Sequence, residues 1–117
     1  MTKRPYTGSC QCGAIAFQVE ADLDQTVTCN CSRCQRLGSV LTMVPASDFK
    51  LTADGRTTEY RFNKHAISHR FCPTCGIHPY GEGQGPDGDA MAAVNIRCIE
   101  GIDLAAVPVT HFDGRSK

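Results

Sequence analysis

Eight cysteines in a chain of 117 residues limit what this sequence can fold into more than any other feature. They form three short clusters and one singleton: Cys10 and Cys12; Cys29, Cys31 and Cys34; Cys72 and Cys75; and Cys98. Closely spaced cysteine pairs are typical of structural zinc sites in reducing compartments. A disulfide framework is the alternative, and it belongs to secreted proteins.

The composition favours the metal interpretation. The first residues, MTKRPYTGSC, lack the apolar run of a signal peptide, and no stretch reaches membrane-spanning length. We therefore expect a cytoplasmic protein without a membrane partner, in which thiols stay reduced and bind metal. Twelve Lys and Arg residues balance twelve Asp and Glu residues. This balance lacks the basic surplus of nucleic-acid-binding proteins, so nucleic acid is not an expected partner.

The hydrophobic pattern predicts an all-β fold with very little helix, in a single domain over residues 1–117. In GAIAFQVE the apolar residues Ile15, Phe17 and Val19 alternate with polar ones, as in a half-buried strand. Further strands are expected in five segments: 39–44, 57–62, 66–71, 90–99 and 107–112. Turn residues separate them, notably at 45–48, 53–55 and 81–89. Single helical turns are expected after Cys31 and around 103–106.

The first and third clusters share a detail that assigns them to one site. Each ends in a cysteine followed by glycine, at Gly13 in CQCG and at Gly76 in CPTCG. Glycine permits the positive φ that a metal-binding turn often requires after its second ligand. We therefore predict a tetrahedral four-cysteine structural zinc site made of Cys10, Cys12, Cys72 and Cys75.

The middle cluster differs because it has three cysteines and no glycine directly after them. Three thiolates at Cys29, Cys31 and Cys34 could hold a second zinc with its fourth position open, incompletely occupied after purification. An open position is what a catalytic zinc site keeps for water or substrate. Cys98 is interpreted as a buried core thiol on the apolar face shared with Val94 and Ile96. The fourth ligand could instead be Cys98 or a histidine, with four candidates: His65, His69, His78 and His111.

A zinc held by three thiolates is electron-rich, which decides the chemistry that it suits. Its bound water should keep a higher pKa than in hydrolytic zinc enzymes, so hydrolysis is a poor expectation. It suits a fourth, exogenous thiolate, which it could hold ready to attack a carbonyl or release from a C–S bond.

These residues, in this order, resemble the glutathione-dependent formaldehyde-activating enzyme family, which includes centromere protein V. The resemblance runs from G-S-C-Q-C-G at Gly8 through C-N-C-S-R-C and F-C-P-T-C-G to V-N-I-R-C and the closing H-F-D-G at His111. It implies a β-tent of short antiparallel sheets clipped by zinc, with the structural and catalytic sites divided as above. The implied activity is that of a carbon–sulfur lyase that joins glutathione to formaldehyde as S-hydroxymethylglutathione, or cleaves this adduct.

Three residues near the third cluster are candidates for the proton transfer that such a reaction needs: His69, His78 and Tyr80. Period two also permits a half-buried strand histidine at 69 and a packing role for Tyr80. The competing function is a non-catalytic, zinc-stabilised module that binds another protein. In that case both zinc sites would be structural.

Overall fold

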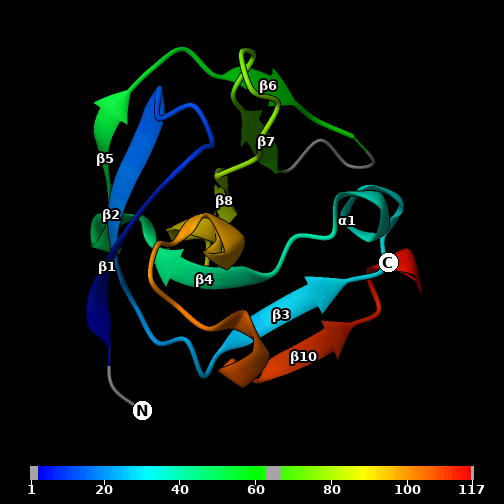
Figure 1. The fold of residues 1–117 in the computed structure, drawn as a ribbon. Helices are drawn as coiled ribbons and strands as arrows, with labels where there is room; N and C mark the ends of the chain where they lie inside the picture. The colour runs from blue at the N-terminus through cyan, green and yellow to red at the C-terminus, as the bar shows by residue number, and fades with distance from the viewer. Residues whose placement is uncertain (1–2, 63–66, 117) are drawn as a thin grey trace.

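The structure is a computed structural model that describes residues 3–62 and 67–116. Within these residues the fold is all-β, as predicted, and its strands lie in two sheets (Figure 1). The smaller sheet has the order β1-β2-β5, formed by β1 (Arg4–Ser9), β2 (Ile15–Ala21) and β5 (Phe49–Asp54). The larger sheet has the order β10-β3-β4-β9-β8-β7-β6. Its members are β3 (Thr26–Cys29), β4 (Leu41–Pro45), β6 (Thr58–Tyr60), β7 (Ser68–Phe71), β8 (Tyr80–Gln84), β9 (Ala90–Asn95) and β10 (Val109–Phe112).

The predicted alternation in β2 is confirmed. Ile15, Phe17 and Val19 are buried, whereas Gln18 and Glu20 between and after them are exposed. A strand turns successive side chains to opposite faces, so this pattern leaves one face of the small sheet packed and the other in solvent. The packed face meets Val44 of β4 and residues of β9 in the main hydrophobic core.

The pairing of β10 is an exception to the antiparallel arrangement expected of the sheets. β10 pairs with β3 in parallel, from Val109 opposite Thr26 to Phe112 opposite Cys29. The remaining strand pairs of the described residues are antiparallel. Parallel neighbours need a long connection, and here most of the chain lies between β3 and β10. The consequence is functional, because this pairing places the C-terminal segment beside the middle cysteine cluster.

Helix is scarce, as predicted. Among the described residues, one short α-helix, α1 (Ser32–Leu37), follows Cys31, and there are four 3₁₀ turns: η1 (Ala46–Asp48), η2 (Ile96–Cys98), η3 (Leu104–Ala106) and η4 (Gly114–Ser116). The predicted strand over 90–99 is wrong beyond Asn95, since the Asn95 side chain accepts a hydrogen bond from the Arg97 N–H and starts η2. No helix within the described residues is long and apolar enough to cross a membrane.

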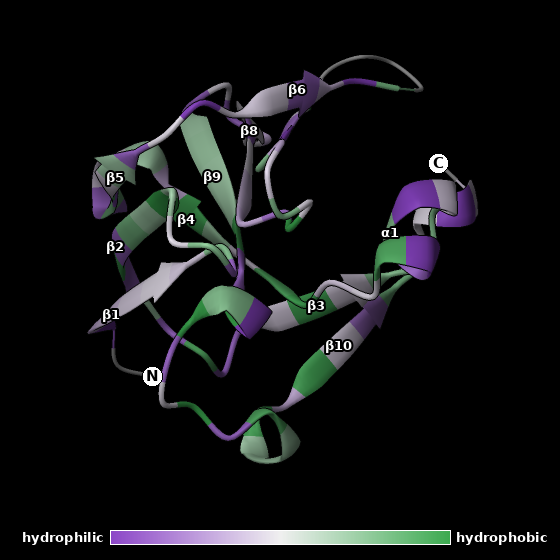
Figure 2. Ribbon diagram, turned by 45° about the horizontal axis from the view of Figure 1, so that its top comes forward, coloured by the Kyte–Doolittle hydropathy of each residue, from purple (hydrophilic) through white to green (hydrophobic). Residues whose placement is uncertain are grey.

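Two core clusters connect the fold to the cysteines. The main cluster lies between the two sheets, and a second one contains Cys10, Ile15, Cys72 and Tyr80. Hydropathy colouring shows apolar segments along β2, β4 and β9, where the sheets face each other (Figure 2). Cys10 and Cys72 are thus part of the core. The middle cluster lies at the start of α1, which is near the C-terminus (Figure 1).

Candidate metal centres

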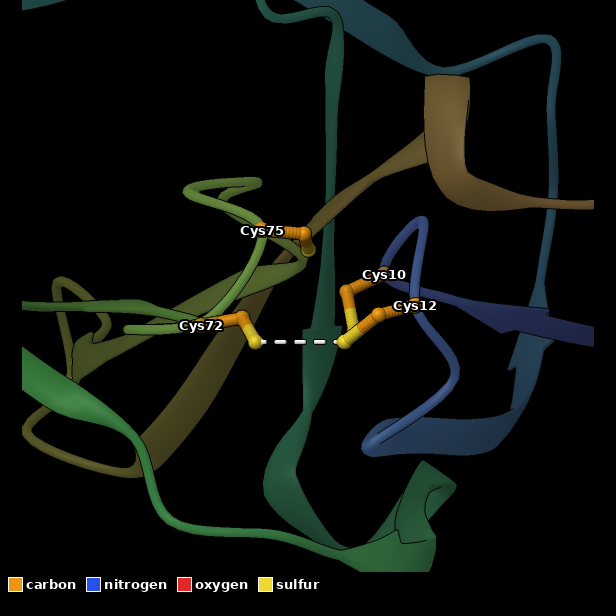
Figure 3. A group of neighbouring side chains, drawn as sticks. All are labelled: Cys10, Cys12, Cys72 and Cys75. Carbon is orange, nitrogen blue, oxygen red and sulfur yellow. Dashed lines mark hydrogen bonds between the residues drawn. The ribbon is translucent and has the colours of Figure 1, made fainter.

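The structure brings the first and third cysteine clusters together, as the sequence predicted. The sulfur atoms of Cys10, Cys12, Cys72 and Cys75 all lie within 4.8 Å of one another. Two loops supply them, one after β1 and one after β7, and the side chains point to a common centre (Figure 3). That these four residues bind zinc stays a prediction. Their geometry can be compared with that of a tetrahedral zinc site.

The two loops have the same backbone hydrogen bonds. The N–H of Cys10 donates to the carbonyl of Ile15 at 2.9 Å, and the N–H of Cys72 donates to the carbonyl of Ile77 at 2.9 Å. The glycine of each loop has a positive φ, 82° at Gly13 and 80° at Gly76, as predicted. Only glycine adopts this conformation without strain, which explains its place in both motifs.

The sulfur separations suit tetrahedral zinc. Four thiolates at about 2.3 Å from a zinc ion lie about 3.8 Å from each other. Cys12 Sγ lies 3.7 Å from Cys10 Sγ and 3.6 Å from Cys72 Sγ. Backbone N–H groups also favour the charged form that a metal requires, because the N–H groups of Ile77 and then Cys12 lower the pKa of Cys75 to about 6. The four residues therefore fit a closed structural site.

The middle cluster is assembled at a junction between β3 and α1. Cys29 is the last residue of β3, Cys31 is the N-cap of α1, and Cys34 lies within the helix. Their sulfurs also lie within 4.8 Å of one another. No histidine, carboxylate or fourth cysteine of residues 3–62 and 67–116 joins this group. A three-thiolate donor set fits a zinc ion with one position left for an external ligand.

Backbone donors stabilise negative charge in this cluster unevenly. The N–H of Cys31 donates to Cys29 Sγ at 3.4 Å, and the N–H of Cys34 donates to Cys31 Sγ at the same distance. Burial is the largest single influence on Cys31 and raises its pKa, but hydrogen bonds from Cys34, Arg33 and Cys29 together outweigh it, and the net pKa is lowered. Burial and the neighbouring Cys31 raise the pKa of Cys34 to about 12. Without a cation, then, the cluster resists full deprotonation.

The C-terminal segment closes one side of the middle cluster. The Asn30 side chain donates to Asp113 Oδ1 at 2.9 Å and accepts from the Arg115 N–H at 2.9 Å. Gly114 packs so closely that a Cβ at this position would overlap Cys29 Sγ. The closing H-F-D-G motif is therefore part of the site, although the sequence had suggested only its His111, as a possible fourth ligand, and His111 does not join the three cysteines.

The three cysteines also form part of the wall of a cavity of about 440 Å³. His69 and His78 line it as well, with ring centroids 5.9 Å apart. His78 is 4% exposed, and its Nδ1 has no hydrogen-bond partner within the described residues. Burial, then the positive charge of Arg33, lowers the pKa of His78 to about 4, and the same causes lower the pKa of His69. Both imidazoles are therefore neutral at physiological pH.

The remaining sequence candidates lie elsewhere. Tyr80 is buried in the second core cluster, where its ring lies 4.8 Å from that of Phe49, and it does not line the cavity. Cys98 packs against the main core, its Sγ 3.9 Å from the carbonyl of His78, and burial raises its pKa to about 11. His65 lies outside the described residues.

Asn95 helps to position His78, a role that the hydrophobic period did not predict. The alternation placed it opposite the core, but it is 7% exposed and its amide donates to the His78 carbonyl at 2.9 Å. It thereby fixes the backbone that carries His78. The V-N-I-R-C motif could have indicated a role, because an asparagine before a 3₁₀ turn is a common cap.

Comparison with known proteins gives consistent results. The family model described as "Glutathione-dependent formaldehyde-activating enzyme" matches residues 5–112. A Phaeosphaeria nodorum protein named "Putative glutathione-dependent formaldehyde-activating enzyme" is 27% identical over 115 residues, which cover 92% of this chain and 55% of that protein. The chain thus spans about half the length of this relative. The crystal structure of a Rhodobacter sphaeroides protein is similar with a TM-score of 0.76 and 30% identity, covering 89% of this chain and 99% of that one.

Proposed function

The chain belongs to the glutathione-dependent formaldehyde-activating enzyme family, and from this premise we propose that it is a zinc-dependent carbon–sulfur lyase acting on a thiol–aldehyde adduct. Cys10, Cys12, Cys72 and Cys75 hold the structural zinc in this proposal. The other three clustered cysteines would hold the second zinc, and the substrate sulfur would complete its set of ligands. The main support for this proposal is that three thiols line a cavity together with two neutral histidines. No fourth protein donor of the described residues joins these thiols.

Zinc in this site, when bound, supplies a cation that keeps a substrate thiol deprotonated at neutral pH. The chain's own residues supply the rest. The N–H groups of Cys31 and Cys34 hold the cysteine sulfurs in place. Apolar side chains form most of the cavity wall, and polar contacts formed against such a wall are stronger than in bulk water.

His78 is the proposed proton carrier. It is neutral, lines the cavity and has an unpaired Nδ1. In the forming direction it takes the proton that the thiol loses. The sulfur then bonds to the carbonyl carbon, the π pair moves to oxygen, and His78 returns the proton to that oxygen. Cleavage is the reverse, so atoms and protons balance without an oxidant. The ring of His69 lies beside that of His78, with the two ring centroids 5.9 Å apart.

The primary test is a thermal-shift titration of the zinc-loaded protein with glutathione. A ligand that binds only the folded state raises the midpoint in proportion to the logarithm of its concentration. Millimolar glutathione should raise the midpoint of the wild type and leave that of Cys31→Ser unchanged. The exchange rate between glutathione, formaldehyde and S-hydroxymethylglutathione, measured by exchange NMR, should rise with the wild type and fall to the uncatalysed value with His78→Gln. No thermal shift with any thiol would refute the proposal.

One observation favours the binding-module alternative. Four exposed apolar side chains surround the cavity: Leu37, Met43, Ile67 and Phe112. Exposed apolar residues grouped in this way often mark a contact with another molecule. A binding module predicts no response to thiols and no loss of partner binding in Cys31→Ser as long as the variant folds, so the same titration separates the two functions.

A further inference from the structure

Two cavities, each of about 440 Å³, meet at the middle cysteine cluster. Cys29 and Cys34 line both of them, so a ligand sulfur bound among the three cysteines has space on two sides. The first cavity is more polar than the second and is lined by side chains that include Asn30, Gln35, His111 and Asp113. The second is the cavity that contains His69 and His78.

The first cavity offers partners for a charged ligand. Asp113 supplies a carboxylate, and its pKa is lowered by hydrogen bonds from Ser116 and then Asn30. The Arg115 guanidinium donates to the Gln35 side chain at this edge. Carboxylates and guanidinium groups form charge-assisted hydrogen bonds with the ammonium and carboxylate groups of an amino-acid-like thiol. This side suits the polar backbone of the thiol.

The second cavity offers no such partners. Its described lining contains no Lys, Arg, Asp or Glu side chain, and the two histidines in it are neutral. Apolar residues come from separate elements, among them Val27 of β3, Met43 of β4 and Phe62. A carboxylate placed here would lose hydration and find no opposite charge in the lining, only neutral donors such as Ser39 and the histidines, which is unfavourable. This side suits a neutral apolar group.

The size of the second cavity points to more than one carbon. One water occupies about 30 Å³ of liquid volume, and a one-carbon carbonyl is only slightly larger. Formaldehyde would therefore leave most of about 440 Å³ unfilled. A chain of several carbons would cover the apolar wall and gain the free energy of removing it from water.

We propose that the apolar cavity takes the carbon side of the adduct, and that the substrate aldehyde carries a neutral aliphatic or aromatic group of several carbons. The polar cavity takes the backbone of the thiol, so the two halves of the adduct lie on opposite sides of the cysteine cluster. This inference rests on the proposed function. It replaces formaldehyde by a larger apolar aldehyde in the same balanced addition, in which the thiol proton ends on the carbonyl oxygen.

Stable S-alkyl derivatives of glutathione test this placement by calorimetric titration of the zinc-loaded protein. The probes are S-methylglutathione and S-hexylglutathione, with glutathione itself as reference. Each buried methylene should strengthen binding by a factor of about four. The hexyl derivative has about five more carbons than the methyl one, and burial of about three of them should make it bind about 60-fold more tightly.

Met43 supplies the variant and Val109 its control. Both are exposed apolar strand residues, 52% and 36% exposed, but only Met43 lines the apolar cavity. Met43→Asp should weaken binding of the hexyl derivative far more than binding of S-methylglutathione, so that the hexyl preference is lost. Val109→Asp should keep the preference.

The outcomes separate this inference from the proposed function. Equal affinity of the wild type for the methyl and hexyl derivatives, or an undiminished hexyl preference in Met43→Asp, would overturn the inference while leaving the proposed function in place. If neither glutathione nor its derivatives bind the wild type, the proposed function fails and the inference fails with it.

Discussion

Cys72→Ser and Cys31→Ser should differ greatly in stability, although each removes one thiol from a cysteine group. Cys12 and Cys72, whose sulfurs lie 3.6 Å apart, are 60 residues apart in the chain. The middle cluster spans only Cys29 to Cys34. A clip that closes a longer loop removes more entropy from the unfolded chain, and the ratio of these two lengths corresponds to about 2 kcal/mol.

Burial adds to this difference. Cys72 is fully buried in the second core cluster, so its replacement leaves the thiols around it without their shared cation. Leaving a buried polar group unsatisfied costs about 1–3 kcal/mol, and more when it is charged. Together these terms reach several kcal/mol, a large part of the roughly 5–15 kcal/mol that stabilises a domain. Cys72→Ser should therefore unfold or aggregate.

Cys31→Ser should stay folded. Serine keeps an N-cap acceptor for α1, where Cys31 Sγ now accepts from the Cys34 N–H. Asn30 still binds the C-terminal segment through Asp113 and Arg115, which needs no metal. The variant should lose the second zinc and keep the first.

The assay combines urea unfolding followed by circular dichroism with a chelator titration of zinc under reducing conditions. Cys31→Ala is the matched control, because it removes both the thiol and the cap and should be about 1 kcal/mol less stable than Cys31→Ser. If Cys72→Ser and Cys31→Ser lose the same free energy of unfolding, the division into a structural and an open site is wrong, and the middle cluster is structural too.

Three further predictions follow from single residues. Gly114→Ala should lower zinc occupancy of the second site, because the new Cβ would overlap Cys29 Sγ. Gly85→Ala is the control and should not lower it, since a Cβ there would meet mainly the flexible Met91 side chain. Equal zinc occupancy in the two variants, measured by chelator titration, would contradict this prediction. Cys98→Ala should leave the zinc stoichiometry unchanged and cost about 1 kcal/mol in urea unfolding, and loss of one zinc would identify it as a ligand. Burial lowers the pKa of His78 from 6.5 to about 4, so its NMR signals should titrate near pH 4 and not above 6. The unfolded chain takes up this proton first, so His78 should make the free energy of unfolding fall as the pH drops from 6.5 to about 4.

The sequence was sufficient to predict the all-β class and the grouping of the cysteines. Both depend on local features. The period-two pattern of β2 reports which side of a strand is buried, whatever packs against it. The glycines after Cys12 and Cys75 indicate a turn with a positive φ, which is a local property of the backbone. Both glycines have a positive φ in the structure.

The limits of some strands could not be predicted, because tertiary contacts decide them. Alternation alone extends the strand from Ala90 to Ile99, but the Asn95 side chain caps η2 and ends β9. The strands β1, β3, β5 and β8 had not been identified. The strand β8 contains two glycines and pairs with β7 on one side and β9 on the other. Its neighbours therefore decide that this segment is a strand more than its own side chains do.

The chemical surroundings of the middle cluster were decided by the tertiary structure alone. The sequence determined that three thiols lie close together, since they fall within six consecutive residues. The parallel pairing of β10 with β3 then placed Gly114 against Cys29, and the approach of β7 and β8 placed His69 and His78 in the same cavity wall. These residues are far apart in sequence, and no local pattern records which segments meet, because the burial of whole sheet faces decides it.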